Sequence, residues 1–129
     1  MRRTLKKTEI LRGFRSFTHV IKNGKCLKSD QFSIYWIKSD SKKAGFAVSK
    51  KVGKAVKRNR IRRILKEAYR NIKYKFPDNY SYVFIVNRPD IQIKYSTLLE
   101  DMERGAEKLS RIESSGDSSK INTSGSRVL

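Results

Sequence analysis

Residues 50–73 read KKVGKAVKRNRIRRILKEAYRNIK, and this stretch predicts a long amphipathic helix. Its apolar residues recur at the spacing of one helical face: Ile61, Ile64, Leu65, Ala68 and Ile72. At about 100° per residue, the opposite face carries Asn59, Arg62, Arg63, Lys66, Arg70 and Lys73. Solvated helix faces usually mix both signs of charge, and Glu67 is the only carboxylate in this stretch. The helix therefore indicates a binding surface for a polyanion.

The composition supports the same interpretation. The chain has 129 residues, with 31 Lys and Arg against 12 Asp and Glu, and a formal net charge of +19. This length is typical of one domain with a single core. A charge of this size favours a nucleic acid as the partner, because each neutralised phosphate releases a counterion. An anionic membrane surface is the alternative, but the sequence lacks a basic helix with a Trp, Phe and Leu face.

Targeting features are not evident in the sequence. The charged residues 1–13 are not followed by an apolar stretch of a secretory signal, and no segment approaches the ~18 apolar residues of a membrane span. The single cysteine, Cys26, has no second thiol with which to form a disulfide or a metal site. We therefore expect a reducing, cytoplasmic location and a packing role for Cys26.

The pattern of apolar residues predicts an α/β (α+β) sandwich on one sheet. Helices are expected at residues 11–22, within residues 50–73 and at residues 96–109, and strands at residues 26–29, 31–38, 44–52 and 80–87. Residues 44–52, the basic helix and residues 80–87 would form a β-α-β unit, which pattern alone assigns a right-handed crossover. A single domain over residues 11–110 is expected between a basic flexible N-terminus (1–10) and a disordered tail (111–129).

The aromatic residues divide between a core and a possible groove. Phe32, Ile34 and Trp36 alternate with Tyr35 along one strand, so Tyr35 faces the other side of the sheet. Phe17, Ile21 and Tyr35 could line a groove beside the basic helix, where bases of single-stranded RNA would pack. Core packing is an equally open interpretation for Phe17 and Tyr35, and double-stranded RNA stays open as a ligand. The remaining large rings are expected in the core: Phe14, Phe32, Trp36 and Phe84.

Catalytic chemistry is not indicated for the polypeptide alone. A metal-dependent nuclease needs clustered carboxylates, or a histidine paired with another acid or base. Most of the acids outside the last predicted helix fall in turns, and no two share a face of a predicted element. Neither a phosphate-binding glycine loop nor a dinucleotide-binding motif is present. We expect neither a catalytic residue nor a metal ligand in this chain.

Several segments resemble the bacterial ribonuclease P protein component. Residues 49–53 (SKKVG), 55–56 (AV) and 58–63 (RNRIRR) resemble the family's basic helix and the segment before it. Residues 17–24 (FTHVIKNG) resemble its first helix, and residues 32–37 and 82–89 resemble two of its strands. The resemblance covers about residues 11–109. One departure is Ile21, which stands where the family has an aromatic residue one turn after Phe17.

The resemblance implies a single domain with a four-stranded mixed sheet, three helices and a left-handed β-α-β crossover. It implies a subunit that joins a catalytic RNA and assists endonucleolytic removal of the 5′ leader from precursor tRNA. The RNA would carry the catalysis and hold most of the magnesium, and the protein would be a monomer within this ribonucleoprotein. The alternative is a ribosomal or ribosome-assembly RNA-binding protein without a reaction.

The resemblance and the basic helix face together assign two sets of site residues. The RNA-binding set follows the basic helix and the segment before it: Lys50, Lys51, Lys54, Arg58, Asn59, Arg60, Arg62, Arg63, Lys66 and Arg70. The leader-binding cleft would contain Phe17, Ile21 and Tyr35.

Overall fold

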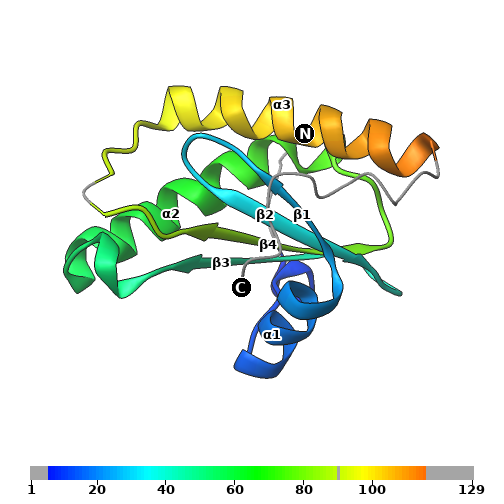
Figure 1. Ribbon diagram of the computed structural model, residues 1–129, viewed down its shortest axis with the longest axis horizontal. Coiled ribbons are helices and arrows are strands. Elements are labelled where there is room, and N and C mark those ends of the chain that lie inside the picture. The colour runs from blue at the N-terminus through cyan, green and yellow to red at the C-terminus, as the bar shows by residue number, and fades with distance from the viewer. Residues whose placement is uncertain (1–5, 90, 116–129) are drawn as a thin grey trace.

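The computed structural model describes residues 6–89 and 91–115, which form a mixed sheet with helices on both faces (Figure 1). The α-helices are α1 (Phe14–Asn23), α2 (Ala55–Ile72) and α3 (Tyr95–Ser115). The strands are β1 (Lys25–Lys28), β2 (Ser33–Lys38), β3 (Lys43–Val48) and β4 (Tyr80–Val86). Short 3-10 helices occur at η1 (Lys7–Glu9), η2 (Lys50–Val52) and η3 (Lys73–Lys75). The predicted α+β class, with four strands and three helices, is confirmed.

The strand order in the sheet is β1-β2-β4-β3. β2 pairs with β1 and β4 in antiparallel orientation, whereas β3 pairs with β4 in parallel. Because β3 and β4 are parallel neighbours joined through α2, they form the predicted β-α-β unit. The left-handed sense of its crossover stays a prediction from the family resemblance.

The larger core lies between one face of the sheet and helices α2 and α3 (Figure 1). Ile34 and Trp36 of β2, and Phe32 just before it, belong to this core, as their alternation predicts. The ring of Phe84 on β4 stacks on that of Phe46 on β3, with centroids 5.5 Å apart. The buried residues of α2 are Ile61, Leu65, Ala68, Tyr69 and Ile72, so the predicted apolar face is the buried face.

A smaller core lies between α1 and the other face of the sheet. Its buried residues are Val20, Cys26, Tyr35 and Val83. Val83 and Phe84 are both buried but belong to different cores, so β4 is apolar on both faces. Cys26 is buried and has the packing role expected for it. Within the described part of the chain, no helix is both long and apolar enough to cross a membrane.

Phe14 was expected in the core, but its side chain is 85% exposed. The first helix begins at Phe14, with Gly13 as its N-cap, rather than at residue 11. At about 100° per residue, Phe14 points roughly 120° away from Val20, the buried residue of α1. The prediction failed because the spacing of apolar residues does not fix which turn of α1 first meets the sheet.

The strand predicted over residues 44–52 ends at Val48, and η2 follows it. The side-chain oxygen of Ser49 accepts the backbone N–H of Lys51 at 3.3 Å, and the Ser49 carbonyl accepts that of Val52 at 3.0 Å. These bonds turn the chain out of the sheet, since Ser commonly competes with the ladder for local backbone donors. Lys50 and Lys51 therefore lie on a turn before α2.

Within the described residues, ordered structure extends beyond both predicted domain boundaries. Ile10 forms a parallel bridge with Ala44, and the Glu9 carboxylate lies 2.9 Å from the Lys73 ammonium, so residues 6–10 are part of the fold. Helix α3 continues to Ser115 and includes the first five residues of the predicted tail. The rest of both predicted flexible segments, residues 1–5 and 116–129, lies outside the described residues.

Candidate nucleic-acid interface

A groove of about 390 Å³ lies between α2 and the segment that leads into α1, and we call it the basic groove. One wall is the polar flank of α2, with Asn59, Arg62, Arg63 and Lys66. The other wall and the floor are apolar, from Ile10, Leu11, Phe17 and Phe46. The groove thus pairs a row of cations with apolar and aromatic surface. This combination suits a single strand of nucleic acid, whose phosphates and bases need different partners.

The apolar wall is held in place by edge strand β3. The backbone N–H of Leu11 donates to the carbonyl of Ala44 at 2.8 Å. The next residue, Gly45, has no side chain, and the ring of Phe17 occupies the space that a side chain would fill. The predicted site residue Phe17 is therefore fixed at the mouth of the basic groove.

The other two predicted cleft residues do not line the basic groove. Ile21 and Tyr35 belong with Phe17 to the core under α1, so the structure brings the three together. Ile21 is half-buried, but Tyr35 is only 7% exposed. Burial, together with the neighbouring Cys26, raises the pKa of Tyr35 to about 12. Tyr35 therefore offers little ring surface to a ligand.

The predicted RNA-binding cations differ in their present partners. The guanidinium of Arg58 donates to the Gly53 carbonyl at 2.9 Å, so it holds the turn before α2. Arg62 donates to the side-chain oxygen of Asn59, and Arg70 pairs with Glu67. The remaining predicted cations form no side-chain hydrogen bond or ion pair with another described residue: Lys50, Lys51, Lys54, Arg60, Arg63 and Lys66. Their charges are available to a ligand.

The cations assigned to RNA binding lie on two flanks of α2. Asn59, Arg62 and Lys66 face the basic groove, whereas Arg60 lies on the other flank, towards the start of α3. Arg63 lines both sides. The helix therefore presents a ridge with two separate cationic flanks. Sequence reasoning also missed Ile10, Leu11 and Phe46 in the groove, because their positions depend on pairing along β3.

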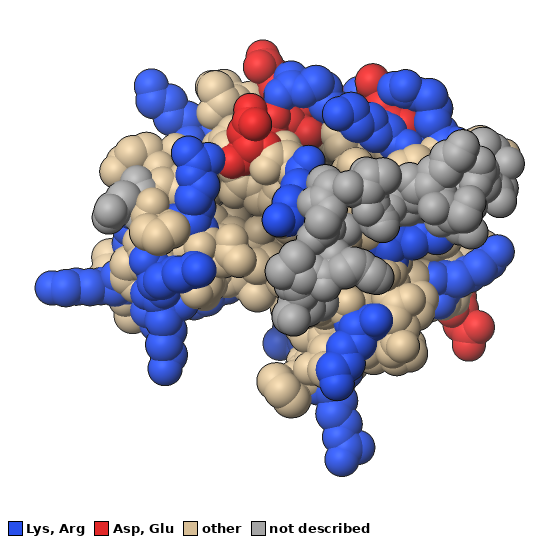
Figure 2. Space-filling model, viewed as in Figure 1, with Lys and Arg blue, Asp and Glu red and all other residues tan. Residues whose placement is uncertain are grey.

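Charge is distributed unevenly over the molecule. In Figure 2 most of the visible acidic side chains gather over α3, while Lys and Arg project around the rest of the surface. The sequence of α3 contains five of the 12 acids, at positions 100, 101, 103, 107 and 113. In contrast, α2 contains only Glu67. A polyanion would therefore be attracted to the α2 side of the molecule.

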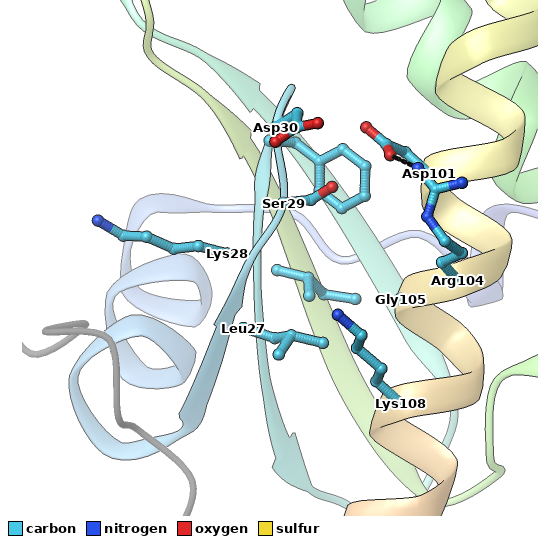
Figure 3. A pocket seen from close by; sticks show the side chains of 10 residues that line it. Leu27, Lys28, Ser29, Asp30, Asp101, Arg104, Gly105 and Lys108 are labelled. Carbon is cyan, nitrogen blue, oxygen red and sulfur yellow. Dashed lines mark hydrogen bonds and ion pairs between the residues drawn. The ribbon is translucent and has the colours of Figure 1, made fainter.

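A second hollow of about 390 Å³ lies between the β1–β2 hairpin and α3 (Figure 3). Part of its polar lining is paired within the protein: Arg104 bonds to Asp101, and the nearby Gln31 donates to the same carboxylate at 3.0 Å. Lys28 points away from the hollow (Figure 3). With both charge signs and internal pairing, this site is a poorer candidate for a polyanion than the basic groove.

Metal coordination is not built into the described residues, which bring no three His, Cys, Asp or Glu side chains together. The acids instead serve the fold. Glu9 pairs with Lys73, and Glu113 accepts hydrogen bonds from Lys25, Trp36 and Tyr80. In both carboxyls burial raises the pKa, but hydrogen bonds to the ionised form outweigh it and leave the pKa below its ordinary value.

Comparison with known proteins agrees with this geometry. The family description "Ribonuclease P" matches residues 5–110. A ribonuclease P protein component from Carboxydothermus hydrogenoformans is 34% identical over 102 residues, which cover 76% of this chain and 88% of the relative. One from Clostridioides difficile is 46% identical over 82 residues, covering 61% of this chain and 72% of the relative.

The fold is also similar to solved structures. The ribonuclease P protein from Thermotoga maritima superposes with a TM-score of 0.67 at 26% identity, covering 78% of this chain and 96% of that one. The family match over residues 5–110 includes all four strands of the sheet and the cationic helix α2. The chain belongs to the ribonuclease P protein family.

Proposed function

We propose that this chain is the protein subunit of a ribonuclease P holoenzyme, in which it binds a catalytic RNA and the single-stranded 5′ leader of precursor tRNA. One observation carries the proposal: the cations of α2, among them Arg63 and Lys66 with no side-chain partner among the described residues, line the same groove as the ring of Phe17. Family membership favours this function over that of a ribosomal protein.

In the basic groove, the phosphates of the leader would follow Arg62, Arg63 and Lys66, and a base would pack on Phe17. Such base–aromatic stacking contributes about 1–3 kcal/mol per base. Mature tRNA lacks the leader and would lose these contacts. The protein would thus favour precursor over product through substrate binding rather than through chemistry.

The reaction itself, endonucleolytic cleavage at the 5′ end of the tRNA, is assigned to the RNA subunit. The RNA would hold the magnesium ions, which supply charge stabilisation to the transferred phosphate. The residues of this chain would bind the substrate and orient it. Two of its acids, Glu9 and Glu113, already pair with residues of the fold. We further propose that the protein acts as a monomer within the ribonucleoprotein, in the cytoplasm.

The test is reconstitution with the ribonuclease P RNA of the same organism. Cleavage of a precursor tRNA is followed at low magnesium, with each component alone as a control. The mixture is expected to release the leader under conditions in which neither component alone does so. If the protein leaves the activity of the RNA unchanged at every magnesium concentration, the proposed function is wrong, and ribosomal RNA becomes the next ligand to test.

A further inference from the structure

The flank of α2 that faces away from the basic groove has a groove of its own. It has a volume of about 530 Å³ and lies between α2 and the first turn of α3. Arg60, Arg63, Ile64, Glu67 and Tyr95 line it, and we call it the Tyr95 groove. The family resemblance assigned only its arginines to RNA binding.

Tyr95 presents a fixed aromatic surface to this groove. It is the first residue of α3, and 36% of it is exposed. Its hydroxyl oxygen accepts a hydrogen bond from the side-chain amide of Asn71 on α2, at 2.7 Å. This bond ties the ring to α2 and limits its rotation. A ring held in this way loses little conformational entropy when a ligand packs on it.

The lining combines this apolar surface with available positive charge. Arg60 and Arg63 form no hydrogen bond or ion pair with another described side chain. The single acid, Glu67, is already paired with Arg70. Val56, which is 81% exposed, lies one turn before Arg60 and extends the apolar surface along α2. An anionic ligand with a flat apolar part matches these features.

We propose that the Tyr95 groove holds an unpaired nucleotide of the catalytic RNA. Its base would pack on Tyr95 and Ile64, and the flanking phosphates would contact Arg60 and Arg63. The proposal rests on the proposed function, because it takes the ribonuclease P RNA as the partner. The leader is not the occupant, since α2 separates this groove from the basic groove and only Arg63 lines both.

The test measures the affinity of the purified chain for the ribonuclease P RNA of the same organism at one fixed salt concentration. Tyr95→Ala and Tyr95→Leu both remove the aromatic face, whereas Tyr95→Phe keeps it and loses only the bond to Asn71. We expect about 5- to 150-fold weaker binding for the first two variants. Tyr95→Phe is expected to bind within about twofold of the unmodified chain. The matched control is Tyr74→Ala, because Tyr74 is 63% exposed and lines neither groove.

Chemical probing of the RNA bases gives a second readout. The unmodified chain is expected to protect at least one unpaired base that Tyr95→Leu leaves reactive. Tyr95→Leu keeps an apolar side chain in the groove that Ile64 also lines. The test therefore stands even where circular dichroism shows that Tyr95→Ala fails to fold. Normal affinity and an unchanged protection pattern for a folded Tyr95→Leu variant would overturn the inference and leave the proposed function intact. If the unmodified chain does not prefer this RNA over an unrelated RNA, the proposed function itself fails.

Discussion

The ring of Phe17 lies directly against the backbone of Gly45, on edge strand β3. A Cβ atom at position 45 would lie 2.4 Å from Cζ and 2.7 Å from Cε1 of that ring. Real Cβ atoms essentially never approach another heavy atom so closely, so the absence of a side chain at Gly45 sets the position of Phe17. A residue of the sheet therefore controls the aromatic surface of the basic groove.

The first prediction is that Gly45→Ala displaces the Phe17 ring. We expect the free energy of unfolding to fall by about 1–3 kcal/mol from overpacking, and the affinity for precursor tRNA to fall with it. Urea denaturation and equilibrium binding measure the two effects. The control is Gly105→Ala in α3, where a Cβ meets no atom within 4 Å and helix propensity favours Ala. Unchanged precursor affinity in a folded Gly45→Ala variant would contradict the assigned role of the ring.

The second prediction concerns the Phe17 side chain itself. Phe17→Ala is expected to weaken binding of the holoenzyme to precursor tRNA by about 1–3 kcal/mol, the range of one lost stacking contact. Binding of mature tRNA should not change, because mature tRNA has no leader to occupy the groove. Phe14→Ala is a matched control on the same helix, since Phe14 is 85% exposed and does not line the groove. An equal loss for both tRNAs would remove Phe17 from the leader site.

The third prediction concerns the salt dependence of RNA binding. Arg63→Gln removes a cation that lines both grooves, and Lys28→Gln removes one at the end of β1 that lines neither groove. Log affinity falls as log salt concentration rises. We expect Arg63→Gln to make this slope shallower by about 0.7–1 for each lost phosphate contact. The slope should stay constant for Lys28→Gln. Equal slopes for Arg63→Gln and the unmodified chain would show that Arg63 contacts no phosphate.

The local pattern of the sequence was sufficient for most of the fold. The spacing in α2 correctly predicted its buried face, and the alternation in β2 correctly separated Trp36 from Tyr35, because both periods follow from backbone geometry alone. The same periodicity placed Phe14 in the core, since spacing gives the relative direction of side chains but not which turn meets the sheet.

The site was less predictable because it depends on contacts between distant segments. Ile10 and Leu11 reach the basic groove through pairing with Ala44, and Tyr95 reaches α2 through Asn71. The spacing of apolar residues within one segment cannot predict contacts between distant segments. The helical spacing also could not show that the fold places another element on each side of α2, so that Arg62 and Lys66 line one groove and Arg60 lines the other.

The last prediction concerns Glu113, which lies in the segment predicted to be a disordered tail. Its carboxylate accepts hydrogen bonds from the Lys25 ammonium and the Trp36 indole, both at 2.6 Å, and from the Tyr80 hydroxyl at 2.9 Å. These contacts fasten the end of α3 to β1, β2 and β4. Glu113→Gln is expected to lower the free energy of unfolding by about 1.5–3 kcal/mol at neutral pH, the range for hydrogen bonds to a charged group.

The pH dependence follows from the pKa of the same carboxyl group. Its hydrogen bonds outweigh burial and lower the pKa in the folded chain below the ordinary value of 4.5. The stability contributed by ionised Glu113 is therefore fully present above about pH 4.5 and is lost as the pH falls through the folded pKa. The difference between the unmodified chain and Glu113→Gln should shrink over this range in urea titrations. Glu100→Gln, an exposed site on α3, should change stability by less than about 0.5 kcal/mol at any pH. A difference that persists unchanged at low pH would mean that Glu113 acts through packing rather than through its charge.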